Sequence, residues 1–114
     1  MKETKAKGRN ELLPGTLEML ILKTLSIEPM HGYGIAQHIQ LLSSDVLTIE
    51  EGSLYPALQR MLVKGWVLAE WKISANNRRA RYYTLTSDGK KQLGVEESRF
   101  SQMSGAIMRV MKTT

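Results

Sequence analysis

The stretch from Glu50 to Trp66, EEGSLYPALQRMLVKGW, constrains the fold of this 114-residue chain more than any other. Its apolar side chains recur at intervals of three and four residues, the spacing that places them on one face of an α-helix. They are Leu54, Ala57, Leu58, Met61 and Leu62. Ser53 is expected as the N-cap, so that Pro56 falls in the first turn, where a missing N–H costs little. Gly65 is expected to end the helix in the left-handed conformation.

The opposite face of this predicted helix, residues 52–64, carries no acidic side chain. It presents uncharged polar, aromatic and cationic groups, namely Pro56, Gln59, Arg60 and Val63, flanked by Ser53, Tyr55 and Lys64. A helix of this kind fits the major groove of B-DNA, where side chains read base edges. An ordinary amphipathic surface helix is the alternative interpretation. The neighbouring segments are needed to choose between this interpretation and a DNA-reading helix.

A change of hydrophobic period directly after this helix predicts a β-hairpin. Residues 66–74 alternate, with one face formed by Val67, Ala69, Trp71 and Ile73. Residues 75–77 supply the turn, because Asn tolerates a positive φ. Residues 79–85 return, with Leu85 facing the core. The aromatic side chains expected in the core are Tyr83, Trp66 and Trp71, whereas Tyr82 is expected outside.

The tip of the predicted hairpin gathers cations. They are Lys72, Arg78, Arg79 and Arg81, and no acid occurs between Trp71 and Ser87. Phosphate oxygens are the natural counterpart, because a guanidinium group can bind them through two N–H groups at once. A solvated basic loop is the alternative. The position of the loop directly after a helix-turn-helix pattern favours contact with DNA.

Two further helical segments precede the central helix. Residues 15–26 carry two apolar stripes, so this helix needs two partners: the domain core is one, and an adjoining subunit is a candidate for the other. The stripes are Leu17, Leu20, Ile21 and Leu25, and Met19 with Leu22. Residues 32–42 are expected to turn inward Ile35, Ala36, Ile39 and Leu42. Gly32 and Gly34 suggest the close approach of another backbone.

This order of segments predicts a winged helix-turn-helix, a mainly α fold of the α+β class. Residues 1–11 are expected to form a flexible basic arm, residues 12–86 the winged helix domain, and residues 87–114 a C-terminal helix capped by Thr86. This last helix would be too long for a small core. A heptad seam along it predicts a dimer contact, formed by Leu93, Phe100, Met103, Ile107 and Val110.

Composition narrows the function classes. The net charge of +5 is compatible with nucleic acid, and the lack of cysteine excludes disulfides and thiol chemistry. No apolar run reaches the roughly 18 residues of a membrane span, and no secretory signal is recognised. We therefore expect a cytoplasmic protein without membrane contact. His31 and His38 lack companion ligands, so no metal or other cofactor is expected, and no catalytic constellation is found.

Several short motifs resemble those of the PadR-like transcriptional regulators. The most specific is Gly52-Ser53-Leu54-Tyr55-Pro56-Ala57-Leu58, and residues 15–17, 31–33, 78–83 and 85–89 support it. The resemblance implies a homodimeric winged-helix repressor that binds operator DNA through the third helix and the wing, with the C-terminal helix as dimer contact. Some members respond to phenolic acids or drug-like molecules, so the resemblance also implies a small aromatic effector as a candidate partner.

The expected function is sequence-specific binding of double-stranded DNA by a homodimer that recognises a pseudo-palindromic operator. The candidates for base edges or nearby phosphates are Ser53, Tyr55, Gln59 and Arg60, and those for phosphates alone are Lys64, Arg78, Arg79 and Arg81. A winged-helix module that binds another protein instead of DNA is the alternative. An enzyme is disfavoured, because the polar constellation it would need is missing.

Overall fold

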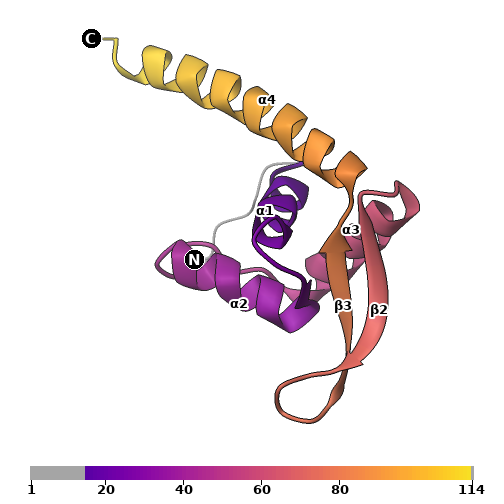
Figure 1. The fold of residues 1–114 in the computed structure, drawn as a ribbon. Coiled ribbons are helices and arrows are strands. Elements are labelled where there is room, and N and C mark those ends of the chain that lie inside the picture. The colour runs from indigo at the N-terminus through magenta and orange to yellow at the C-terminus, as the bar shows by residue number, and fades with distance from the viewer. Residues whose placement is uncertain (1–14, 114) are drawn as a thin grey trace.

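Four helices and a small antiparallel sheet make up residues 15–113, the part of the chain that this computed structural model describes (Figure 1). In order they are α1 (Thr16–Leu25), β1 (Met30–His31), α2 (Gly32–Leu42), α3 (Glu51–Val63), β2 (Val67–Ile73), β3 (Arg79–Leu85) and α4 (Ser87–Met111). The predicted winged helix-turn-helix is confirmed. The predicted basic arm, residues 1–11, lies outside the described residues. Within residues 15–113, no helix has the length and apolar content that crossing a bilayer requires.

The sheet has the strand order β1-β3-β2. β2 and β3 form the predicted hairpin, in register from Val67 opposite Leu85 to Ile73 opposite Arg79. Asn77 adopts a φ of 63° at the turn, as the sequence predicted. We call the hairpin, residues 67–85, the wing. The two-residue strand β1, which the sequence did not predict, pairs with β3 and so ties the start of α2 to the wing.

The core lies between the helices and the base of the wing, with α1 near its centre (Figure 1). Ile21 and Leu22 come from the two predicted stripes of α1, and both are completely buried. The chain's own core therefore covers Leu22 without a second subunit. The predicted inner face of α3 is confirmed, because Leu54 and Leu58 are also fully buried. Leu42 was expected inside, but it is 69% exposed at the last turn of α2, where the chain leaves the core.

The start of α3 differs from the prediction. The N-cap is Glu50 rather than Ser53, and the backbone carbonyl of Glu50 accepts hydrogen bonds from the N–H groups of Ser53 and Leu54. Pro56 consequently lies in the second turn, where it cannot donate to the carbonyl of Gly52, an exposed residue. Glu51 now lies in the first turn, near the positive end of the helix dipole, so the helix does carry an acid.

The end of α3 follows the prediction. Gly65 has a φ of 79°, and the N–H groups of Gly65 and Trp66 donate to the carbonyls of Leu62 and Met61, as in a Schellman motif. Thr86 is the N-cap of α4, and its hydroxyl oxygen accepts a hydrogen bond from the N–H of Gly89. The same hydroxyl lies 2.7 Å from the carbonyl oxygen of Gly65, to which it donates. Hydrogen bonds thus connect the end of α3 to the start of α4, and we call this contact, formed by Gly65, Thr86 and Gly89, the joint.

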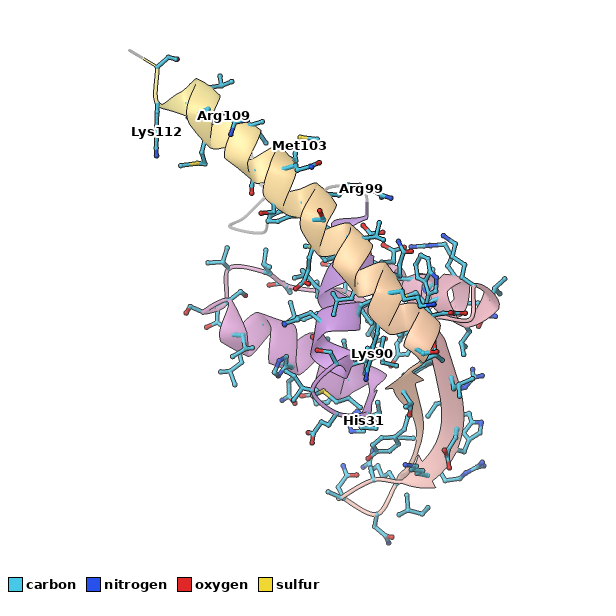
Figure 2. The ribbon with its side chains drawn as sticks, turned by 45° about the horizontal axis from the view of Figure 1, so that its top comes forward. His31, Lys90, Arg99, Met103, Arg109 and Lys112 are labelled. Atoms are coloured by element: carbon cyan, nitrogen blue, oxygen red, sulfur yellow. The ribbon has the colours of Figure 1, made fainter. Side chains whose placement is uncertain are left out.

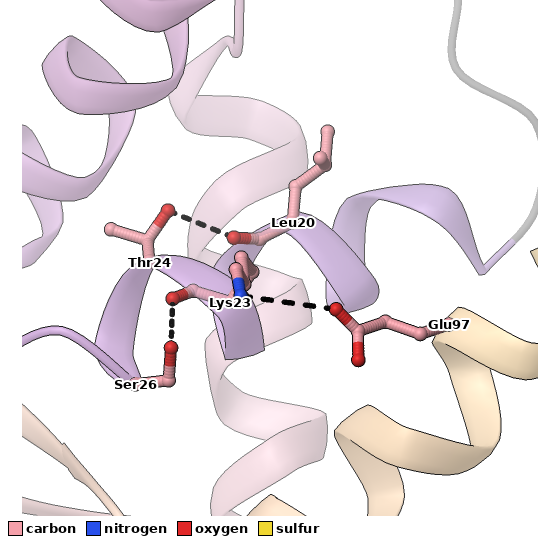
Figure 3. Close-up of polar contacts among 5 residues, drawn as sticks. All are labelled: Leu20, Lys23, Thr24, Ser26 and Glu97. Carbon is pink, nitrogen blue, oxygen red and sulfur yellow. Dashed lines mark hydrogen bonds and ion pairs between the residues drawn. The ribbon is translucent and has the colours of Figure 1, made fainter.

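The first turns of α4 pack on the domain, and its later turns extend past it. Leu93 is only 8% exposed and belongs to the core. Lys23 of α1 forms an ion pair of 3.9 Å with Glu97 of α4 (Figure 3). Beyond this contact the helix leaves the body of the protein, and Met103 and Arg109 lie on the extended part (Figure 2).

Candidate nucleic-acid interface

A concave groove of about 770 Å³ lies between the wing and the starts of α2 and α3. We call it the wing groove. It is lined by His31, Gly32, Tyr33, Gln37, Tyr55, Trp71, Ser74, Ala75, Asn76, Arg78, Arg79, Ala80, Arg81 and Tyr83. Four of the lining residues are tyrosine or tryptophan, whose rings can hydrogen-bond or stack, and three are arginines. No aspartate or glutamate lines it, so the groove is suited to an anionic ligand with flat or polar groups.

The pairing of β2 with β3 decides which wing residues face this groove. Trp71 lies opposite Arg81, and Arg79 follows two residues away on the same face. Burial along this face falls from Val67, which is buried, to Trp71, which is 58% exposed. The prediction that Trp71 packs in the core was therefore wrong, because the hairpin extends past the helices before Trp71 is reached. Trp66, at the base of the wing, does pack against the core.

Tyr55 joins α3 to the groove. Its ring lies over Gly32, so closely that a Cβ added there would be 2.7 Å from the phenol oxygen. The sequence predicted close approach of a backbone at Gly32, but the neighbour is this side chain. Partial burial, followed by the charge of Glu51 and the proximity of Tyr83, raises the pKa of Tyr55. A phenol is protonated at neutral pH even without this shift, so Tyr55 can donate a hydrogen bond to an anionic oxygen.

The start of α2 contributes residues that the sequence analysis did not select. Tyr33 and Gln37 line the groove, and the amide of Gln37 donates to the hydroxyl of Tyr33 at 3.3 Å. His31 caps α2 by accepting a hydrogen bond from the N–H of Gly34, and its ring meets the edge of Tyr82 at 5.2 Å. The i, i+4 spacing of Tyr33 and Gln37, on the face opposite the buried side of α2, was the available signal.

The predicted contact residues divide into two groups. Tyr55, Arg78, Arg79 and Arg81 come together in the wing groove. Ser53 and Gln59 are exposed on α3 outside the groove lining. Lys64, at the C-cap of α3, lies 4.7 Å over the ring of Trp66 and does not line the groove.

Arg60 has a partner within the chain that the sequence did not reveal. Its Nε and Nη2 groups donate to one carboxylate oxygen of Glu18, at 3.1 and 2.7 Å. This contact joins α3 to α1. The other ion pairs of residues 15–113 join Lys23 with Glu97 and Arg99 with Glu96, so the cations of the wing have no carboxylate partner in that part of the chain. Their positive charge is free to meet an external anion.

No cluster of three or more metal-ligating side chains occurs within the described residues. The polar groups that line the wing groove include three arginines, whose N–H groups are suited to binding anionic oxygens.

Comparison with known proteins identifies the family of this architecture. The sequence profile described as the transcriptional regulator PadR-like family matches residues 21–95. A PadR-like transcriptional regulator from Bacillus cereus is 26% identical, with a TM-score of 0.75, and the match covers 88% of this chain and 95% of that one. A PadR family transcriptional regulator from Eggerthella lenta is 28% identical, with a TM-score of 0.72, over 88% of this chain and 85% of that one.

A protein from Streptococcus mutans is 30% identical, with a TM-score of 0.74, over 84% of this chain and 86% of that one. The family match covers the helix-turn-helix, the wing and the start of α4. The motifs of the sequence, the winged-helix fold and the acid-free groove agree with this match. The chain belongs to the PadR-like family of transcriptional regulators.

Proposed function

We propose that this regulator is a repressor that binds a pseudo-palindromic operator as a homodimer. The observation that carries the proposal is the wing groove, in which three arginines that have no carboxylate partner within residues 15–113 face the start of α3. A DNA backbone supplies the phosphates that such arginines bind, and an exposed helix beside them can enter the major groove.

Each contact residue has a proposed role in this complex. Arg78, Arg79 and Arg81 would bind phosphates, and the protonated phenol of Tyr55 would donate to a phosphate or a base edge. The exposed side chains of Ser53 and Gln59 would meet base edges, as Gln does with adenine. Lys64 would bind a phosphate at the other end of α3. Arg60 keeps further N–H groups beside those bound to Glu18, and its exposed side chain would use them for a base edge or a nearby phosphate.

The proposed dimer contact is the extended part of α4. Its exposed apolar side chains include four of the five predicted from the heptad pattern, namely Phe100, Met103, Ile107 and Val110. Leu93 is taken up by the core of its own chain and does not take part. Two copies related by a two-fold axis would present two α3 helices to two half-sites, which is the reason for the expected palindrome.

A pair of substitutions tests the DNA-binding proposal. Arg79→Ala should weaken binding similarly on all duplexes and lower the slope of log K against log salt by about 1, because one phosphate contact is lost. Gln59→Ala should relax the preference at one base pair instead. Both are measured by fluorescence anisotropy on the best duplex selected from a random pool and on unrelated duplex. A loss confined to one operator would contradict a phosphate role for Arg79.

A simpler measurement distinguishes DNA binding from the alternative function, a winged-helix module that binds another protein. A mobility shift on nonspecific duplex at low salt should show binding by wild type, since the wing cations have no ion-pair partner among the described residues. The family resemblance also implies an effector, and we include in the proposal that a small aromatic molecule relieves repression. It is tested by titrating phenolic acids into the complex with the selected duplex, and dissociation of the complex is the expected result.

A further inference from the structure

Two of the three arginines of the wing groove, Arg79 and Arg81, lie over aromatic rings. The guanidinium carbon of Arg79 lies 4.8 Å from the centre of the Trp71 ring, a distance typical of a cation–π contact. The strand register explains this contact, because Arg79 is paired with Ile73 and Trp71 is the diagonal neighbour on the same face. Both side chains line the wing groove. Arg81 has a longer contact of the same kind, 6.0 Å from the ring of Tyr83.

The exposure of Trp71 requires an explanation. An indole that is 58% exposed contributes little to the core, and Trp71 is not among the residues that pack against it. The side chain lies instead under a cation that has no carboxylate partner in residues 15–113. A carboxylate in this place would also hold the guanidinium, but it would neutralise the charge that a phosphate needs. A ring holds the guanidinium through its face and leaves its N–H edge and its charge available.

We propose that Trp71 is a positioning residue for DNA binding, which acts by holding Arg79 in the orientation that meets a phosphate. The inference rests on the proposed DNA-binding function. A long arginine side chain loses rotamer freedom when it binds, and this loss weakens binding unless the free protein already holds the side chain in place. Stacking on Trp71 restricts Arg79 before DNA arrives. Trp71 itself makes no phosphate contact in this scheme.

The chain offers matched controls. Leu68 lies on the same strand as Trp71, is similarly exposed, and points to the opposite face of the sheet. Leu68→Ala therefore controls for the loss of an exposed apolar side chain from β2. Arg78 lies at the tip of the wing, also lines the groove, and has no ring contact of this kind among the described residues.

The experiment is a double-mutant cycle in the full-length chain. Binding of the selected duplex is measured by anisotropy at several salt concentrations for Trp71→Ala, Arg79→Ala and the double variant. Trp71→Ala should weaken binding roughly two- to fivefold, the size of an exposed cation–π contact. It should leave the salt slope unchanged, because Arg79 still reaches its phosphate. In the Arg79→Ala background, Trp71→Ala should have no further effect.

Three further variants sharpen the result. Trp71→Phe should recover most of the affinity, since Phe also presents a ring face, and Leu68→Ala should bind like wild type. In an Arg78→Ala background, Trp71→Ala should keep its full effect, because Arg78 does not use the ring. Circular dichroism should show all variants folded, as expected for exposed positions.

Two outcomes would overturn the assignment. If Trp71→Ala costs as much without Arg79 as with it, the indole contacts DNA directly and does not act through Arg79. If Trp71→Ala has no effect in either background, the ring contact contributes nothing to binding. A wild-type chain that binds no duplex at low salt would instead overturn the DNA-binding proposal itself, so the two failures are distinguishable.

Discussion

Gly32 shows how one missing side chain shapes the wing groove. At the first position of α2, it leaves the space that the ring of Tyr55 fills. Gly52, at the second position of α3, is also helical, but an added Cβ would meet no atom within 4 Å. The two glycines therefore provide a matched pair for separating helix propensity from the contact with Tyr55.

Gly32→Ala and Gly52→Ala should change stability in opposite directions. Gly32→Ala should lower the free energy of unfolding by about 1–2 kcal/mol, because the new methyl group overlaps Tyr55. Gly52→Ala should raise it by roughly 0.5–1 kcal/mol, since Ala is the better helix former and the site is open. Urea denaturation of both variants and of wild type measures these changes in the free energy of unfolding. Gly32→Ala should also bind DNA more weakly, because the methyl group displaces the ring of Tyr55. An unchanged affinity would show that the position of this ring does not contribute to DNA binding.

At the scale of the elements, the joint between α3 and α4 connects the DNA-binding part to the proposed dimer contact. The hydroxyl of Thr86 accepts from the N–H of Gly89 and shares its single proton between the carbonyls of Gly65 and Trp66. Gly89 is buried directly against the carbonyl oxygen of Trp66, which leaves no room for a side chain. The direction in which α4 leaves the domain is therefore set at the last turn of α3.

Removing the hydroxyl of Thr86 should loosen this joint. Thr86→Val keeps the shape of the side chain but loses the N-cap, which costs about 0.5–2 kcal/mol and lowers the melting temperature by several degrees. Thr86→Ser keeps the oxygen and should stay close to wild type. Thermal denaturation followed by circular dichroism distinguishes them. A loss in Thr86→Ser, with Thr86→Val close to wild type, would show that the methyl group, rather than the hydroxyl, stabilises the joint.

At the scale of the whole molecule, α4 and the wing point in different directions, so dimer contact and DNA contact would occupy separate regions (Figures 1 and 2). The burial of the large apolar side chains of α4 changes around Glu96, between Leu93 and Phe100. Glu96 is held within its own chain by a 2.7 Å hydrogen bond from Gln92. Before it, Leu93 is buried, and after it the apolar side chains from Phe100 onward are exposed.

A charge on the exposed apolar face of α4 should prevent dimer formation. Ile107→Asp should yield monomers at micromolar concentration, because a carboxylate would be buried against the apolar face of the partner helix. Ser98→Asp is the control, since it adds the same charge to the same helix on the opposite face. Sedimentation equilibrium measures the mass. A dimeric Ile107→Asp variant would show that this face does not form the contact.

The loss of the dimer should affect operator binding in a defined way. The Ile107→Asp monomer should bind a single half-site about as well as wild type does, because the wing groove is unchanged. It should lose the additional affinity for the two-site operator that linkage of two binding modules provides. Fluorescence anisotropy with one-site and two-site duplexes measures the affinity of both proteins for each duplex.

The amino-acid sequence by itself determined the helices, the hairpin, the turn at Asn77 and the cap at Thr86, because periodicity, caps and turns depend on residues a few positions apart. The start of α3 was the local exception. There the extended backbone of Glu50 and two hydrogen bonds to its carbonyl began the helix earlier than the side chain of Ser53 suggested.

Only the tertiary structure decided what each side chain meets. Nothing in the sequence pattern pairs Arg60 with Glu18, 42 residues earlier, yet the fold brings the two side chains into contact. Trp71 looked like a core residue until the length of the wing placed it beyond the helices and under Arg79. Such contacts depend on how far each element extends past its neighbours in space, and a pattern that repeats every two to four residues carries no information about that distance.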